Sequence, residues 1–258
     1  MGPTVSHLGV IGALPEEVEL LHDRLVDEHE ERIARRTYRT GRLADVPGCP
    51  RVTLVQSRMG KVAAAVTATT LIREFGVDGI VFTGIAGALA PVVAIGDVVI
   101  ATDLVQHDIH GPPDEFRRGD VPLLGVREFV ADPALSDAAE RAALDFFGGG
   151  LADLVPETVL ADLGIHRPTV HRGRVVTGDE FVHGDGRAVV IGREASAMCV
   201  DMEGAAVAQV CFEHDGVPLC VIRSISDLAS GEAVTDFPRF RDALARHYAW
   251  EIIRRMWG

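Results

Sequence analysis

Carboxylates gather where several apolar stretches of the sequence end. The runs GVIGALPEE, IVFTGIAG, RVVTGDEF and CVIRSISD each begin as a buried strand would and end in polar or glycine-containing residues. In open α/β sheets, ligands bind beyond the carboxyl ends of the strands. If these strands are parallel neighbours, their ends meet at one crevice. We expect that crevice to hold Glu16 or Glu17, Asp179 or Glu180, and Ser226 with Asp227, with the turn before Glu203 beside them.

The chemistry that suits such a crevice is general acid–base catalysis on a ligand that is neutral or becomes positive during the reaction. Acids dominate the set, and Arg223 and Lys61 are the bases nearby. A phosphate-rich ligand would require the opposite balance, and the sequence lacks the phosphate-loop pattern G-x-x-x-x-G-K-[ST]. Each feature also has a purely structural explanation. Glu16 and Glu17, for example, could simply stabilise the start of a helix.

The segment CVDMEGAAVAQVC, from Cys199 to Cys211, is small and apolar but carries two acids near its start. Burial of a carboxylate is costly unless it is paired or hydrogen-bonded. We expect Glu203 to begin a helix, where the helix dipole favours negative charge, and to face the crevice. For Asp201, the expected role is to cap that helix.

Two other kinds of site are not expected. GVIGA matches only part of the dinucleotide-binding fingerprint, because its third glycine is missing, so an oxidoreductase is disfavoured. His107, Asp108 and His110 lie close together in QHDIHG, but no further ligand set at zinc spacing accompanies them. We therefore expect no metal and no cofactor.

Strands and helices alternate along the whole sequence. Apolar runs predict strands at 8–13, 35–41, 51–56, 79–91, 96–108, 172–181 and 218–227. Helical spacing predicts helices at 15–25, 61–75, 133–147, from 203 onward and at 237–256, while 110–130 and 148–170 are expected to be loops. Without a break in mid-chain, this alternation predicts a single α/β domain over residues 1–258 with a largely buried central sheet.

Composition excludes several classes of partner. The 258 residues include 25 basic and 38 acidic side chains, a net charge of −13, which disfavours nucleic acid and anionic membrane surfaces. No apolar run reaches transmembrane length, and the N-terminus lacks the pattern of a signal peptide. The four cysteines form no C-x-x-C pair, which is typical of reduced thiols in a cytoplasmic protein.

Six motifs together resemble those of the nucleoside phosphorylase/nucleosidase superfamily. They are GVIGALPEEVELL, SRMGKVAAAVTATTLI, VFTGIAGALAPVVAIGDVVIA, GRVVTGDEFV, CVDMEGAAVAQVC and VIRSISDLA, and the resemblance extends over about residues 8–240. Within the superfamily, the chain is similar to the 5′-methylthioadenosine/S-adenosylhomocysteine nucleosidases. The resemblance implies a central mixed, twisted sheet flanked by helices, no cofactor, a purine nucleoside as substrate and a homodimer in which the partner helps to close the 5′ end of the site.

The resemblance also implies a role for individual residues. Glu17 would activate the attacking water, and Asp227 would donate a proton to purine N7 with Ser226 orienting it. The remaining expected contacts are Glu203 with the ribose hydroxyls, Met202 with the sugar, Phe181 and Val182 with the purine, and Leu14, Met59, Phe237 and Ile85 around the sugar and 5′ substituent.

The first turn, GALPEE, favours water over phosphate as the nucleophile. Phosphorylases of the superfamily carry glycines and basic residues there, whereas a carboxylate would repel phosphate and could accept a proton from water. The chain departs from its relatives at Ile85, where many carry serine, and at Asp201, where glutamate is common. We therefore keep three alternatives: a futalosine-type nucleoside hydrolase, a purine nucleoside phosphorylase and a non-catalytic nucleoside-binding module.

Overall fold

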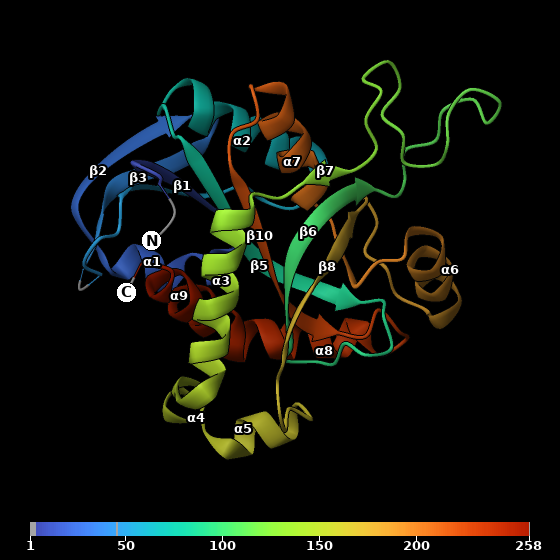
Figure 1. The fold of residues 1–258 in the computed structure, drawn as a ribbon. Helices are drawn as coiled ribbons and strands as arrows, with labels where there is room; N and C mark the ends of the chain where they lie inside the picture. The colour runs from blue at the N-terminus through green and yellow to red at the C-terminus, as the bar shows by residue number, and fades with distance from the viewer. Residues whose placement is uncertain (1–3, 45, 258) are drawn as a thin grey trace.

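The computed structural model describes residues 4–44 and 46–257 and contains a ten-stranded mixed sheet flanked by helices (Figure 1). The strands are β1 (His7–Gly12), β2 (Leu25–Ile33), β3 (Arg36–Leu43), β4 (Arg51–Gln56), β5 (Gly79–Ala88), β6 (Val98–Gln106), β7 (Phe129–Val130), β8 (Val170–Thr177), β9 (Cys199–Asp201) and β10 (Leu219–Asp227). The α-helices are α1 (Glu19–Asp23), α2 (Lys61–Arg73), α3 (Pro133–Asp145), α4 (Leu151–Leu154), α5 (Glu157–Asp162), α6 (Asp185–Ala195), α7 (Gly204–Glu213), α8 (Ala233–Phe240) and α9 (Arg246–Arg255). A 3₁₀ turn, η1 (Pro15–Glu17), and two π-helical segments, η2 (Phe146–Gly150) and η3 (Arg241–Ala245), complete the elements.

Strand β5 is the centre of the sheet and is buried along its whole length. One of its edges pairs with β10 in parallel. The other edge is shared: its first residues pair in parallel with β1 as far as Phe82, and its last residues, from Gly87, pair antiparallel with β9. Because β1 and β9 separate between these points, residues 83–86 are left without a strand neighbour on that edge.

The strands around β5 close into a ring. β5 pairs with β10, β10 with β6, β6 with β8, β8 with β9, and β9 again with β5. β1, β5 and β10 are parallel neighbours, as the sequence predicted, but β8 is not one of them. The end of β8 reaches the same region because the ring closes. The prediction that this strand ends at the crevice was therefore right, but the expectation that it is a parallel neighbour of the other three strands was wrong.

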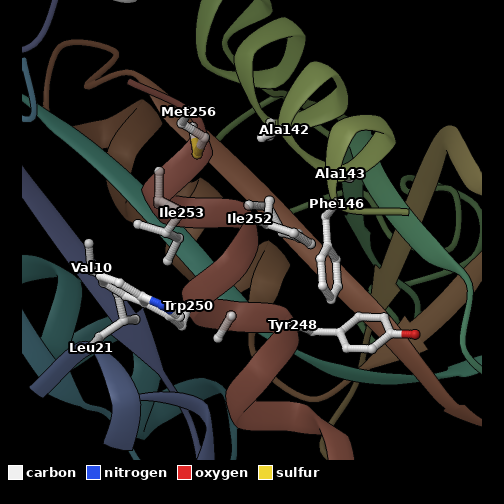
Figure 2. Packing of buried hydrophobic residues seen from close by; sticks show 14 of the residues in the cluster. Val10, Leu21, Ala142, Ala143, Phe146, Tyr248, Trp250, Ile252, Ile253 and Met256 are labelled. Carbon is white, nitrogen blue, oxygen red and sulfur yellow. The ribbon is translucent and has the colours of Figure 1, made fainter. Parts of the chain in front are cut away.

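Two apolar layers cover the sheet. On one face, α9 packs between α1 and α3, and Figure 2 shows Trp250 of α9 beside Val10 and Leu21, with Tyr248 beside Phe146. On the other face, α2 packs against α7 over the alternate residues of β5. Alternation along β5 explains this arrangement, since successive side chains of a strand point to opposite faces.

The expected fold class, a single-domain α/β fold with a central mixed sheet flanked by helices, is confirmed. The predicted domain limits, residues 1 and 258, lie outside the described residues. Within the described ranges, no helix has both the length and the apolar character needed to cross a membrane.

Several predicted elements differ from those in the structure. The expected helix at 15–25 is only η1 and α1, because Val18 leaves the helical conformation between them. The charged strand β2 and the helix α6 were not predicted, and the expected loop at 148–170 contains α4 and α5.

Candidate active site

A cavity lies at the edge of β5, between the residues that pair with β1 and those that pair with β9. Residues from distant parts of the chain line this cavity. Every residue to which the resemblance gives a role lines this cavity: Leu14, Glu17, Met59, Ile85, Phe181, Val182, Met202, Glu203, Ser226, Asp227 and Phe237. Of the two pairs that the sequence left open, Glu17 and Glu180 line the cavity. Glu16 instead lies 3.4 Å from Arg241 Nε.

The Glu17 carboxylate is held by three backbone N–H groups. Its Oε2 accepts hydrogen bonds from Ala13 at 2.6 Å and Leu14 at 2.9 Å, and its Oε1 accepts one from Ile85 at 3.1 Å. The Ile85 N–H is available because Ile85 belongs to the stretch of β5 that has no strand neighbour on the edge opposite β10. Burial raises the pKa of Glu17, although these hydrogen bonds and Arg223 oppose the shift. The arrangement fixes a carboxylate that can take up a proton more readily than an exposed one.

Asp227 ends β10 with its carboxylate at the cavity. Oδ2 accepts a hydrogen bond from the Ser226 hydroxyl at 2.7 Å, and Oδ1 accepts one from the Ala229 N–H at 2.8 Å. Only 2% of the residue is exposed, and this burial raises its pKa. A carboxyl group with a raised pKa can stay protonated at higher pH and act as a general acid.

Glu203 is the residue immediately before α7, as predicted, and its side chain crosses to the start of α2. Its Oε1 accepts a hydrogen bond from the Gly60 N–H at 2.8 Å. Burial and the neighbouring Asp201 raise the pKa of Glu203 to about 8, while Arg223 acts in the opposite direction. Gly60 has a φ of 95°, a conformation that favours glycine, so this contact depends on the residue type.

Asp201 also lines the cavity and accepts hydrogen bonds from the N–H groups of Glu203 at 3.3 Å and Gly204 at 3.1 Å. These bonds agree with the expected capping role. The sequence did not reveal its second partner, Arg223, whose Nε donates to Asp201 Oδ2 at 2.7 Å. The signal that could have revealed it was an arginine directly after the apolar run Leu219–Ile222 of β10, since a buried charge requires a partner.

Two aromatic rings border the cavity. Phe181, in the segment between β8 and α6, and Phe237, on α8, lie edge to face with ring centres 5.4 Å apart. Such a wall provides a flat apolar surface for a planar group. Among the residues described, no group of three or more His, Cys, Asp or Glu side chains is arranged to hold a metal ion.

Comparison with known proteins relates the chain to one superfamily. The family model for the phosphorylase superfamily matches residues 7–256. The 5′-methylthioadenosine/S-adenosylhomocysteine nucleosidase of Mycobacterium tuberculosis is 37% identical over 254 residues, which cover 96% of this chain and 95% of the relative. The corresponding enzyme of Anoxybacillus flavithermus is 32% identical and covers 97% of both chains.

Solved structures agree in fold over nearly the same length. The nucleosidase of Neisseria meningitidis, in complex with methylthio-immucillin-A, superimposes with a TM-score of 0.83 at 32% identity and covers 97% of this chain and 98% of its own. The futalosine hydrolase of Helicobacter pylori superimposes with a TM-score of 0.78 at 30% identity and covers 97% of both chains.

Proposed function

Because the chain belongs to the phosphorylase superfamily, and within it to the 5′-methylthioadenosine/S-adenosylhomocysteine nucleosidases, we propose that it hydrolyses the N-glycosidic bond of these two nucleosides. The products are adenine and the corresponding 5-thioribose. The observation that carries the proposal is the set of three buried carboxylates, Glu17, Glu203 and Asp227, around one cavity.

The carboxylates suit the charges that develop as the bond breaks. Cleavage gives the sugar oxocarbenium-like positive charge and moves electrons into the base, so Asp227 protonates N7 and makes adenine a better leaving group. Glu17 removes a proton from the attacking water, and its carboxylate stabilises the positive sugar. Ser226 orients Asp227 through the hydrogen bond between their side chains.

The other contacts position the nucleoside. Glu203 accepts hydrogen bonds from the ribose hydroxyls, and Met202 packs on the sugar. Phe181 stacks on the purine while the backbone at Val182 binds its edge. The 5′ substituent lies against Leu14, Met59, Ile85 and Phe237.

Water, rather than phosphate, is the proposed nucleophile. No lysine or arginine lines the cavity in the described part of the chain. Arg223 lies nearby, but its Nε is paired with Asp201. A phosphate ion in the cavity would therefore face carboxylates with no free cation among the described residues to balance its charge, which is unfavourable in a buried site.

Product analysis tests the proposal directly. The protein is incubated with methylthioadenosine, S-adenosylhomocysteine, futalosine and inosine, each with and without phosphate. We expect free adenine and the free thiosugar from the first two without phosphate. Sugar 1-phosphates would indicate a phosphorylase, preferential cleavage of futalosine would move the substrate to that class, and no cleavage at all would leave a binding module.

A homodimer is also proposed. Exposed apolar side chains lie at and just after one cavity residue: Met59, which lines the cavity, is 47% exposed, and Val62, three residues later on α2, is 76% exposed. The segment between β6 and β7 projects from the body as a long irregular loop (Figure 1), as an arm that closes a partner's site would. Sedimentation equilibrium tests this proposal, since a monomer at micromolar concentration would contradict it.

We propose a cytoplasmic location as well. The four cysteines are all free thiols, and Cys199, Cys211 and Cys220 are buried. Such a set is typical of a reducing compartment. Fractionation of producing cells, followed by immunoblotting, tests this assignment.

A further inference from the structure

We infer that a groove beside the catalytic cavity binds the charged amino-acid end of S-adenosylhomocysteine. The inference rests on the proposed function and deepens it by assigning a second contact region to one of the two substrates. The groove lies between η1, α1, β3 and β4. We call this region the arginine groove, because its lining includes four arginines and two glutamates: Arg35, Arg36, Arg39, Arg58, Glu16 and Glu19.

The arginine groove adjoins the part of the cavity that is proposed to receive the 5′ substituent. Leu14 lines the cavity and the next residue, Pro15, lines the groove. In the same way, Met59 lines the cavity and the preceding residue, Arg58, lines the groove. A short 5′ group therefore ends inside the cavity, whereas a longer one leaves it beside the groove.

The groove concentrates positive charge on a chain whose net charge is −13. Two of its guanidinium groups are occupied: Arg36 donates to three backbone carbonyls, and Arg39 pairs with Glu28 and Glu30 of β2. The other two, Arg35 and Arg58, form no ion pair with any residue that the structure describes. These two groups are available to an anion.

Arg58 and Arg35 are held next to each other. Arg58 Nη2 donates a hydrogen bond to the Arg35 carbonyl oxygen at 2.8 Å. Both residues have left-handed backbones, with φ of 75° and 61°, a conformation that favours glycine. Arginine binds carboxylates through paired hydrogen bonds in a fixed planar geometry. The pair therefore offers a carboxylate a double cationic contact.

Glu16 supplies the opposite charge through its second carboxylate oxygen, since Oε1 already lies 3.4 Å from Arg241 Nε. Its Oε2 is buried and has no hydrogen-bond partner within the described residues. The free end of S-adenosylhomocysteine carries both a carboxylate and an ammonium group, whereas methylthioadenosine ends in a methyl group. Arg35 and Arg58 thus suit the carboxylate of S-adenosylhomocysteine and Glu16 suits its ammonium group. The methyl end of methylthioadenosine gains no comparable contact from these three residues.

Substrate comparison tests the inference. The ratio of kcat/KM for S-adenosylhomocysteine to that for methylthioadenosine is measured for the wild type and for the double variant Arg35→Gln/Arg58→Gln. A third substrate, 5′-butylthioadenosine, is long but uncharged and separates length from charge. In the double variant, we expect the ratio for S-adenosylhomocysteine to methylthioadenosine to fall roughly tenfold, as for loss of a partly exposed charged contact. The ratio for 5′-butylthioadenosine to methylthioadenosine should stay at the wild-type value. The matched control is Arg32→Gln, an exposed arginine on β2 that does not line the groove.

The outcomes separate the two proposals. If the double variant keeps the wild-type ratio, or if kcat/KM for all three substrates falls equally, the arginine groove has no role in substrate selection and the proposed function stands. If the wild type cleaves neither natural substrate, the proposed function fails and this inference fails with it. Added salt is a second readout, since it should lower the ratio in the wild type and have little effect on it in the double variant.

Discussion

Asp201 and Arg223 form an ion pair that is almost completely removed from solvent. Arg223 Nε and Asp201 Oδ2 are 2.7 Å apart, and the two side chains are 1% and 0% exposed. The guanidinium group also lies over the Phe82 ring at 4.2 Å, and Asp201 Oδ1 accepts a hydrogen bond from the Thr177 hydroxyl at 2.5 Å. The pair therefore ties β9, β10 and the neighbouring strands together at the cavity.

Loss of one partner should destabilise the fold strongly. Asp201→Asn removes the only carboxylate that is hydrogen-bonded to the buried Arg223 guanidinium among the described residues, so we expect the free energy of unfolding to fall by about 3–5 kcal/mol. Urea denaturation measures the change. Asp137→Asn, which removes an exposed partner of Arg172, should cost no more than about 1 kcal/mol. Equal effects of the two substitutions would show that burial of the Asp201 pair is unimportant.

Asp227→Asn should remove the proton donor without unfolding the protein. We expect kcat for methylthioadenosine to fall by at least ~10²-fold. An N7-methylated substrate already carries the positive charge on its base, so the same variant should cleave that substrate nearly as well as the wild type does. Steady-state kinetics on both substrates provides the check, and an equal loss on the two would assign Asp227 a structural role instead.

Glu17→Gln should abolish activation of water. The amide oxygen can still accept hydrogen bonds from the Ala13 and Leu14 N–H groups, but its NH2 group faces the Ile85 N–H and loses that bond, so we expect a modest fall in unfolding temperature. Because the amide cannot accept a proton, we expect kcat to fall by at least ~10²-fold in the folded protein. Turnover and thermal unfolding are measured on the same preparation. Turnover near the wild-type value would remove Glu17 from the mechanism.

Gly84→Ala should displace the Glu17 carboxylate. A Cβ atom at this position would lie 3.1 Å from both Glu17 Oε1 and Arg223 Nη1, which is closer than carbon normally approaches these atoms. We expect a lower kcat because Glu17 must shift. Gly148→Ala is the control, since nothing lies within 4 Å of its added carbon. If Gly84→Ala has wild-type kinetics, the Glu17 position is less restricted than the geometry implies.

The sequence predicted the alternation of elements and the meeting of polar residues from several strand ends, because apolar runs and the polar residues after them are local signals. β5 and β10 illustrate this, since each begins with an apolar run, Ile80–Phe82 in β5 and Leu219–Ile222 in β10. The ring of strands could not be predicted in the same way. It depends on the pairing of Gly87 and Ala88 with the three-residue strand β9, and so short a strand has no distinctive pattern.

Two other features escaped prediction for different physical reasons. The edge strand β2 is rich in Asp and Glu, residues that are uncommon in strands, and it forms because β3 pairs with it. The Arg223 partner was missed because the two residues of the pair are far apart in the sequence. The identity of the cavity acids, in contrast, came mainly from the resemblance, since spacing left Glu16 and Glu17 equivalent.

The raised pKa of Glu203 should make stability depend on pH. Burial raises this pKa from an ordinary 4.5 to about 8, so the folded protein binds the proton more tightly than the unfolded chain does. The stability that Glu203 contributes is therefore complete below pH 4.5 and is lost as the pH rises through about 8. Between these values, its contribution to the slope approaches about 1.4 kcal/mol per pH unit.

Glu203→Gln should remove this contribution because the amide does not titrate. Its oxygen can still accept the hydrogen bond from the Gly60 N–H, so the variant keeps the contact and loses only the ionisation. We expect urea unfolding between about pH 5 and 8 to give a shallower decline of stability than in the wild type. Glu213→Gln, on the exposed side of α7, should keep the wild-type slope. If Glu203→Gln also keeps that slope, Glu203 does not titrate in this range, and the cavity must hold it as a carboxylate throughout, balanced by Arg223.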